Sequence, residues 1–221
     1  KLQKGTARQR VNARMKMLST GRWEVIRPLK PLTIEQQLNR NFDRAVILCR
    51  ETIRGISWNT ALETLRIWEY TGQVRRGYFI EGLSGIQFIR EKDYAGTMLA
   101  LEQPRDQIIW LNAIDPAQPW GKCLQHKPDR AFINVIGNVV ALRAGVPVAV
   151  LERQGRSLRV FEQDNIAETL RAFTQDYTRR RIFSSQNRIV VKDYPKEATE
   201  ALSCAGFIHE PQGYVLYRSY R

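Results

Sequence analysis

The sequence predicts an α+β fold, because its hydrophobic pattern changes three times along the chain. Up to Gly72 the apolar side chains recur at helical spacing, and directly after it they follow the pattern of strands and turns. Short alternating strands between Pro- and Gly-bearing turns then occupy residues 107–162. Helical and strand patterns are mixed in residues 164–221. We therefore expect helical, strand-rich and mixed regions in this order.

The helix that ends at Gly72 is the best-defined element of the sequence. Ser57 stands where an N-cap hydroxyl accepts from the free amides of the first turn, and Gly72 stands where a left-handed C-cap ends a helix. Between these caps, at spacings of four, three and three, lie Trp58, Leu62, Leu65 and Trp68. The spacing predicts a helix over residues 58–71 with one apolar face.

A basic hairpin follows this helix, and another helix precedes it. Residues 74–88 read as two strands with a glycine-bearing turn between them. Upstream, Ile34, Leu38 and Phe42 fall at intervals of four on one predicted helix face, and a short apolar strand comes next. Helix, strand, short connection, helix and hairpin form the pattern of a winged helix-turn-helix, which we predict over residues 33–106.

Two further regions complete the predicted organisation. The period-two strands after the winged helix predict a small antiparallel β-sheet or barrel over residues 107–163. A C-terminal α+β element is predicted over residues 164–221. Residues 1–32 are strongly basic and read as the remnant of a preceding element, and the absence of an initiator methionine suggests a fragment.

The charge of the chain indicates its class of partner. The formal net charge is +13 and the isoelectric point is near 10.0. Such a field attracts polyanions, and nucleic acid is the first candidate. An anionic membrane surface is the second, but the sequence has no run of 18 apolar residues and no long basic amphipathic helix.

The candidate nucleic-acid contacts are basic and aromatic residues on the predicted helix, on the hairpin and near the N-terminus. Arginines reach phosphates, and aromatic rings stack on bases. Each assignment has an alternative: paired arginines on a hairpin can be a solvated edge, and a tryptophan can belong to the core. The predicted set comprises Arg22, Trp23, Trp58, Arg66, Arg75, Arg76 and Tyr78.

Several kinds of chemistry have no motif in this sequence. The GxxxxGK[ST], GxSxG and HExxH patterns are absent, so the chain carries no ATPase motif and needs no cofactor of its own. The three cysteines and two histidines lack ligand spacing, which argues against a metal site and fits a reducing cytoplasm. Asp115, which follows a predicted strand, is a candidate general base for water attack on an extruded nucleoside. Asp before Pro is also an ordinary turn former.

Several stretches of the chain resemble the large helicase-related (Lhr) family of superfamily 2 DNA helicases, in the region that follows the two motor domains. The resemblance spans nearly the whole chain, with mild departures at Ser84 and Trp120, where relatives often show glycine and tyrosine. It rests on GRW at residues 21–23, LRIWEYTGQVRRGYFIEGLSGIQF at 65–88, AIDPAQPWG at 113–121, GNVVALRAGVPVAVLERQGRSLRVF at 137–161 and the terminal AGFIHEPQGYVLYR.

The resemblance implies an accessory module of an ATP-dependent translocase that moves along single-stranded DNA and unwinds DNA or RNA:DNA duplexes. ATP and Mg would then serve the motor domains of the full-length protein, which are the expected partners of this region. The same arrangement is similar to winged-helix DNA glycosylases, so a base-excision module that uses Asp115 is the alternative. A winged-helix transcription regulator is a third reading, although no heptad run for dimerisation is visible.

Overall fold

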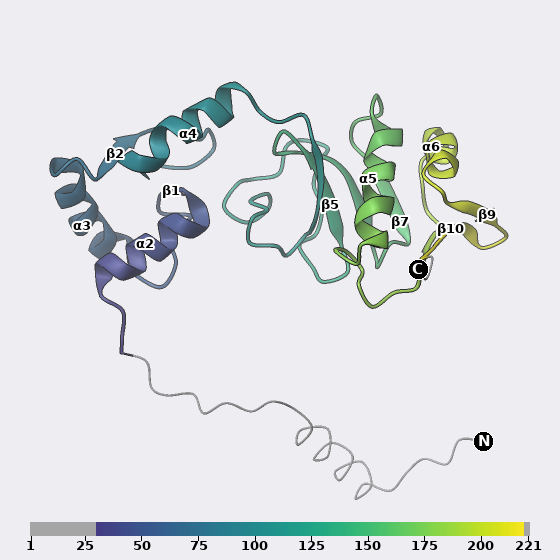
Figure 1. Cartoon of the computed structure of the whole chain (residues 1–221), viewed down its shortest axis with the longest axis horizontal. Coiled ribbons are helices and arrows are strands. Elements are labelled where there is room, and N and C mark those ends of the chain that lie inside the picture. Colours follow the sequence, from purple (N-terminus) through teal and green to yellow (C-terminus); the bar gives the residue numbers. More distant parts are fainter. Residues whose placement is uncertain (1–29, 219–221) are drawn as a thin grey trace, which may run out of the picture. The chain divides into compact units, whose positions relative to one another are not determined.

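The computed structural model describes residues 30–218 and is shown in Figure 1. The chain divides into two compact units, Lys1–Thr33 and Ile34–Arg221. All of the described helices and strands belong to the second unit. Arg22 and Trp23, together with most of the basic segment 1–32, lie outside the described residues.

The N-terminal part of the second unit is a winged helix. It consists of α2 (Ile34–Ala45), β1 (Ile47–Leu48), α3 (Trp58–Tyr70), β2 (Val74–Gly77) and β3 (Gln87–Arg90). The strands form an antiparallel sheet in the order β1-β3-β2, and a turn takes the place of a helix between β1 and α3. Its buried core includes Leu38, Phe42, Leu65, Trp68 and Phe88. The predicted domain type is confirmed.

The caps predicted for α3 are both present. The Ser57 hydroxyl accepts a hydrogen bond from the Thr60 amide at 3.1 Å. Gly72 has φ of 73°, the left-handed region that a residue with a Cβ enters at a cost. The capping residues therefore determine where α3 begins and ends, and the apolar side chains between them pack into the winged-helix core.

Helix α4 (Glu91–Glu102) starts directly after β3 and differs from its prediction. The spacing of Tyr94, Met98 and Leu101, at intervals of four and three, predicts that one face of this helix turns inward. None of the residues of α4 is buried, and Leu101 is 55% exposed. The expectation for Leu101 is wrong because this helix leaves the winged-helix core after its first turn, where Tyr94 contacts Phe79 with ring centroids 6.2 Å apart.

An open four-stranded antiparallel sheet follows. Strands β4 (Ile108–Asn112), β5 (Val139–Arg143), β6 (Val146–Glu152) and β7 (Ser157–Val160) pair in chain order. Among the described residues β4 and β7 are the edges, so the sheet of the prediction forms and a closed barrel does not. Residues 132–135, whose pattern is typical of a strand, lie in a loop, and the turn expected at Ile136, Gly137 and Asn138 is present.

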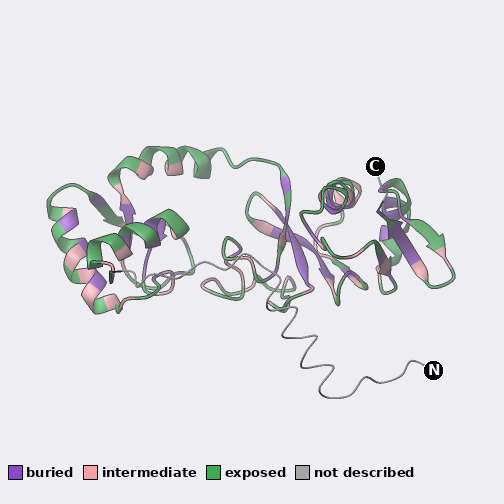
Figure 2. Cartoon of the chain, turned by 60° about the horizontal axis from the view of Figure 1, so that its bottom comes forward, coloured by how far each residue is buried: buried purple, intermediate pink, exposed green. Residues whose placement is uncertain are grey.

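The two faces of this sheet are covered differently. Helix α5 (Ile166–Thr178) packs on one face, between the sheet and α6 (Thr199–Cys204), as Figure 1 shows. A core of Trp110, Ala141, Leu151 and Phe173 lies beneath it. The opposite face is covered by the loop of residues 113–138, over a smaller cluster that contains Val140 and Val150. Figure 2 shows the buried residues gathered along these strands.

The C-terminal element is a second small sheet beside α6. Strands β8 (Arg188–Val191), β9 (Ile208–Glu210) and β10 (Gly213–Tyr217) pair in the order β8-β10-β9, and the 3-10 helix η1 (Lys196–Ala198) leads into α6. The mixed element is as predicted, but residues 179–183 turn instead of forming a strand, with positive φ at Arg180 and Phe183. In the described part of the chain, no helix is long and apolar enough to span a bilayer.

Candidate nucleic-acid interface

Helix α3 presents one covered face and one open face. Trp68 is 8% exposed and belongs to the winged-helix core. Trp58, at the first turn, is half-buried, with its ring centroid 6.3 Å from that of Phe88. Arg66 lies off the apolar stripe and is exposed, as its position in the pattern predicted. The helix can therefore offer Arg66 and part of Trp58 to a ligand.

Tyr70 is a candidate contact that the sequence reasoning missed. It is the last residue of α3 and is 93% exposed. Its neighbour Ile67 is 63% exposed. The available signal was a large aromatic side chain off the apolar stripe, where burial cannot explain it. Tyr78, which the sequence singled out, is 80% exposed at the start of the wing loop.

The wing arginines are exposed, but both are already paired with carboxylates. Arg75 makes two 2.5 Å hydrogen bonds to the carboxylate of Glu91, and its guanidinium lies 4.2 Å from the ring centroid of Tyr94. The hydrogen bonds between Arg75 and Glu91 raise the pKa of Arg75 and lower the pKa of Glu91. Arg76 lies 3.1 Å from Glu69 of α3. A phosphate that binds here has to compete with these carboxylates.

The wing loop is fixed by a buried glutamine. Gln87, 1% exposed, accepts hydrogen bonds from the amides of Phe79 and Ile80 at 2.9 and 2.8 Å. Its own amide donates to the Ile80 carbonyl at 2.9 Å. The Gln87 side chain thus satisfies backbone groups of Phe79 and Ile80 in the wing loop.

The loop of residues 113–138 contains Asp115, whose surroundings favour a turn. Asp115 Oδ1 accepts from the Ala117 amide at 2.9 Å, and the Gln118 amide donates to the Asp115 carbonyl at 3.1 Å. Lys122 Nζ donates to that same carbonyl at 2.5 Å. Burial lowers the pKa of Lys122, while the charge of Asp115 acts in the opposite direction. Asp115 is half-buried and is placed at the end of β4, as predicted.

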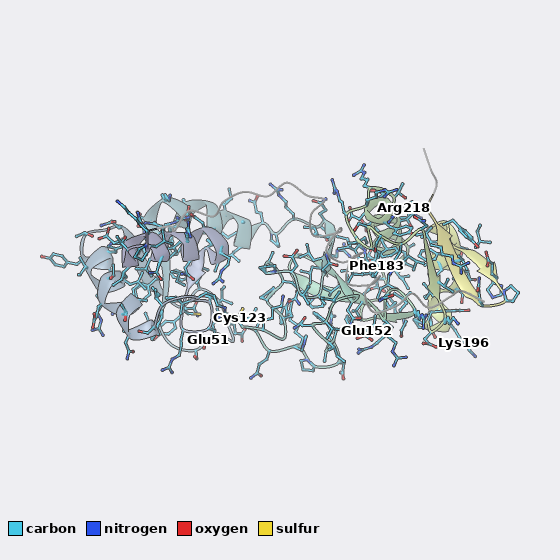
Figure 3. The ribbon with its side chains drawn as sticks, turned by 90° about the horizontal axis from the view of Figure 1, so that it is seen from below. Glu51, Cys123, Glu152, Phe183, Lys196 and Arg218 are labelled. Carbon is cyan, nitrogen blue, oxygen red and sulfur yellow. The ribbon has the colours of Figure 1, made fainter. Side chains whose placement is uncertain are left out.

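A cavity of about 480 Å³ adjoins this turn within the unit Ile34–Arg221. Asp115 is not part of its wall, although its neighbours on both sides are. The winged helix contributes Arg44, Thr52 and Leu83, and the loop contributes Ile114, Pro116, Gln118, Lys122 and Cys123. Figure 3 labels Glu51 and Cys123, which come from the two sides of the cavity.

Glu51 lies in the turn between β1 and α3 and is hydrogen-bonded to Ser84 of the wing loop. It accepts from the backbone amide of Ser84 at 3.1 Å and from the Ser84 hydroxyl. Burial alone would raise the pKa of Glu51, but hydrogen bonds from Cys49 and Ser84 outweigh it and lower the pKa. Burial of Cys49 itself raises the pKa of its thiol. This carboxylate therefore stays charged and holds the wing loop.

The predicted site residues thus fall into three groups. Arg66, Arg75, Arg76, Tyr78 and Trp58 lie on the winged helix, Asp115 lies on the loop over the sheet, and Arg22 and Trp23 lie outside the described residues. Within residues 30–218, no cluster of three His, Cys, Asp or Glu side chains is suited to holding a metal ion.

Comparison with known proteins agrees with this architecture. A family model described as the winged-helix domain of the large helicase-related protein matches residues 32–107. An "Lhr helicase/ probable uracil glycosylase" of Mycolicibacterium smegmatis is 30% identical over 67% of the chain, and an "Lhr helicase/uracil glycosylase" of Escherichia coli is 27% identical over 87%. The chain spans only 11% and 14% of the lengths of these relatives. By its winged-helix domain and these alignments, the chain belongs to the large helicase-related family.

Proposed function

We propose that this chain is a nucleic-acid-binding accessory module of an Lhr-type ATP-dependent DNA helicase. The module engages the translocating single strand, of DNA or of an RNA:DNA hybrid, during unwinding in cytoplasmic DNA repair. In this proposal ATP and Mg bind to motor domains of the full-length protein, as the resemblance to the family implies, and this sequence itself carries no ATPase motif. The observation that supports this function best is the open side of α3 and the wing, which carries exposed arginines and tyrosines in a chain of net charge +13.

Binding on this surface is an exchange of ion pairs. A phosphate displaces Glu91 from Arg75 or Glu69 from Arg76, so the guanidinium passes from one anion to another without losing its charge partner. Tyr70 and Tyr78 offer rings on which bases stack. Phosphate contacts of this kind hold a strand without reading its sequence, which suits a translocating enzyme.

A fluorescence anisotropy titration of single-stranded DNA at several salt concentrations tests the proposal. If about five phosphates are neutralised, log affinity falls against log salt with a slope of about −3.5. Replacing Arg75 and Arg76 by alanine should weaken binding to all sequences equally. The matched control replaces Arg171 and Arg179, two exposed arginines of α5 and its end, and should bind like the wild type.

Two results would contradict the proposal. A flat salt dependence would show that the charge excess is not used for binding. Unchanged affinity of the Arg75→Ala, Arg76→Ala variant, or an equal loss in the Arg171→Ala, Arg179→Ala control, would make the wing arginines a solvated edge.

A second candidate function is excision of a base, and the cavity beside the Asp115 turn favours it. Both relatives named above carry uracil glycosylase in their names. In this reaction Asp115 takes a proton from water as the water oxygen bonds to the sugar C1′, and the base leaves with the electrons of the glycosidic bond. Incubation with a deoxyuridine oligonucleotide, followed by alkaline scission, should give strand breaks that Asp115→Asn abolishes. Intact strands with the wild-type chain would rule it out.

A further inference from the structure

The loop that precedes β5 exposes three aliphatic side chains within four residues. Ile133 is 66% exposed, Val135 is 46% exposed and Ile136 is 86% exposed. Within residues 30–218, no other run of four residues holds three exposed large apolar side chains. Single exposed aliphatic residues are ordinary on a protein surface, but a contiguous group of them marks a site of interaction.

Hydrogen bonds hold this loop against the hairpin between β6 and β7. The side chain of Asn138, which is 5% exposed, accepts from the Arg153 amide at 2.9 Å and donates to the Ile133 carbonyl at 3.0 Å. The Gln154 amide donates to the Gly137 carbonyl at 2.8 Å. The aliphatic side chains therefore project from a backbone that is already ordered, so a partner that binds them does not have to order the loop.

A hollow of about 550 Å³ lies between the loop and the hairpin. Its wall includes the three aliphatic side chains, and it also includes Arg153 and Arg156 of the hairpin. Glu152, the last residue of β6, belongs to the same wall and is labelled in Figure 3. The hollow thus combines apolar side chains with charged groups.

The balance of charge at this hollow is positive. Arg153 and Arg156 are exposed, and neither forms an ion pair with a carboxylate of residues 30–218. Glu152 lies 3.7 Å from Arg159, which offsets its charge. The neighbouring residues 192–193 are a lysine and an aspartate, whose charges offset each other. Two guanidinium groups therefore remain for a partner that carries carboxylates.

The wall of the hollow favours a protein partner over a nucleic acid or a membrane. It has no aromatic ring on which a base could stack. It also lacks the tryptophan and tyrosine that are enriched at membrane interfaces, and a flat bilayer surface would not fill a hollow. Aliphatic side chains of a peptide would fill it and would lose their contact with water.

We propose that this hollow docks an acidic peptide segment of a partner protein. Aliphatic side chains of the segment enter between the loop and the hairpin, and carboxylates beside them pair with Arg153 and Arg156. The hollow takes only a few side chains, so the complex is a small and transient one. This interaction is separate from the strand binding on the wing, and either one can exist without the other.

Selection of a display library of random peptides, about twelve residues long, on the immobilised 221-residue chain tests this inference. The selected sequences should be enriched in aspartate and glutamate next to aliphatic residues. A synthetic peptide of the most enriched sequence is then titrated by fluorescence anisotropy. A version of this peptide with serine in place of its aliphatic residues should bind at least about tenfold more weakly.

Variants of the chain separate the two contributions. Ile136→Ser should weaken binding of the selected peptide about three- to tenfold. Arg153→Gln with Arg156→Gln should weaken it by a similar factor and remove most of its salt dependence. All three side chains are exposed, so both variants should keep the circular dichroism spectrum of the wild type. The matched control, Ile208→Ser with Arg188→Gln, changes an exposed isoleucine and an exposed arginine of the C-terminal sheet and should bind like the wild type.

Several results would overturn the inference. One is a selection without enrichment of acidic sequences, and another is a peptide that binds equally to the wild type and Ile136→Ser. Loss of single-strand affinity in Ile136→Ser would assign the hollow to nucleic acid, and loss of binding to phosphatidylserine vesicles would assign it to a membrane. Self-association of the wild type that Ile136→Ser abolishes in sedimentation velocity would make a second copy of the chain the occupant. Strand affinity should be unchanged in these variants, so failure of this inference leaves the proposed function standing.

Discussion

The wing and the loop of residues 113–138 present their polar groups in opposite ways. On the wing, Arg75 is exposed and fully engaged with Glu91, and water can replace either partner at little cost. In the loop, Gln118 is buried and has one oxygen that water cannot easily reach. The first arrangement allows a charged strand to exchange contacts as it moves. In the second arrangement, removing one partner leaves a buried polar group unpaired, so a substitution there should cost more stability than the loss of an exposed ion pair on the wing.

The largest expected effect concerns the platform that carries the wing. Trp68→Ala leaves a cavity in the winged-helix core and should lower the free energy of unfolding by about 3–5 kcal/mol. Trp58→Ala should cost less stability, because its ring is only half-buried, and should weaken binding of single strands by about 1–3 kcal/mol if it stacks on a base. Thermal melts and strand titrations of both variants separate the two roles. Equal loss of stability with untouched affinity in Trp58→Ala would assign both rings to the core.

An intermediate effect compares the loop with the wing directly. Asn134→Leu removes the partner of Gln118 Nε2 and of the Trp120 carbonyl, and it should lower the free energy of unfolding by about 1–3 kcal/mol. Arg75→Ala removes two hydrogen bonds as well, but its exposed pair should leave the unfolding midpoint nearly unchanged. Urea unfolding of the two variants measures the difference. A larger loss in Arg75→Ala would reverse the contrast between buried and exposed groups.

The smallest expected effect is a gain of affinity. Glu91→Gln frees Arg75 for phosphate and should tighten binding of single strands by less than about fivefold. The pKa of Glu91 lies below its ordinary value in the folded chain, so the ion pair stabilises the fold above the usual titration range of glutamate and is lost as the pH falls through the lowered pKa. In the wild type, Arg75 should be released over that acid range. Affinities of the wild type and Glu91→Gln should therefore converge as the pH falls, and a constant ratio would show that Glu91 does not restrain Arg75.

Elements that are determined by a single segment of the chain could be predicted from local signals in the sequence. The stripe of α3, its Ser57 and Gly72 caps and the existence of strands β4 to β7 follow from hydrophobic period, turn residues and capping chemistry, and the structure confirms them. Buried polar residues had no such signal. Gln87 and Gln118 acquire their roles from backbone groups that the fold brings to them. Arg218 is a third case, 5% exposed and donating to the carbonyls of residues 177, 183 and 184.

The candidate site could be predicted from the sequence only in part. Exposed arginines on a hairpin could be located from the sequence, but their pairing with Glu69 and Glu91 depends on how the wing lies against α3 and α4. Asp115 was predicted at the end of a strand and is found there, in the turn that its position before proline favours. The cavity next to it joins segments about 70 residues apart in sequence, such as Arg44 and Gln118, and no pattern in either segment predicts the other.

The claim that the wing holds the strand through phosphate contacts is tested most directly by the salt slope of single-strand binding, measured on the wild type and on the Arg75→Ala, Arg76→Ala variant. The variant should reduce the magnitude of the slope by about 1.4, because two phosphate contacts are lost. The Arg171→Ala, Arg179→Ala control should keep the slope of the wild type. A slope that is unchanged in the wing variant, or reduced equally in the control, would contradict the claim.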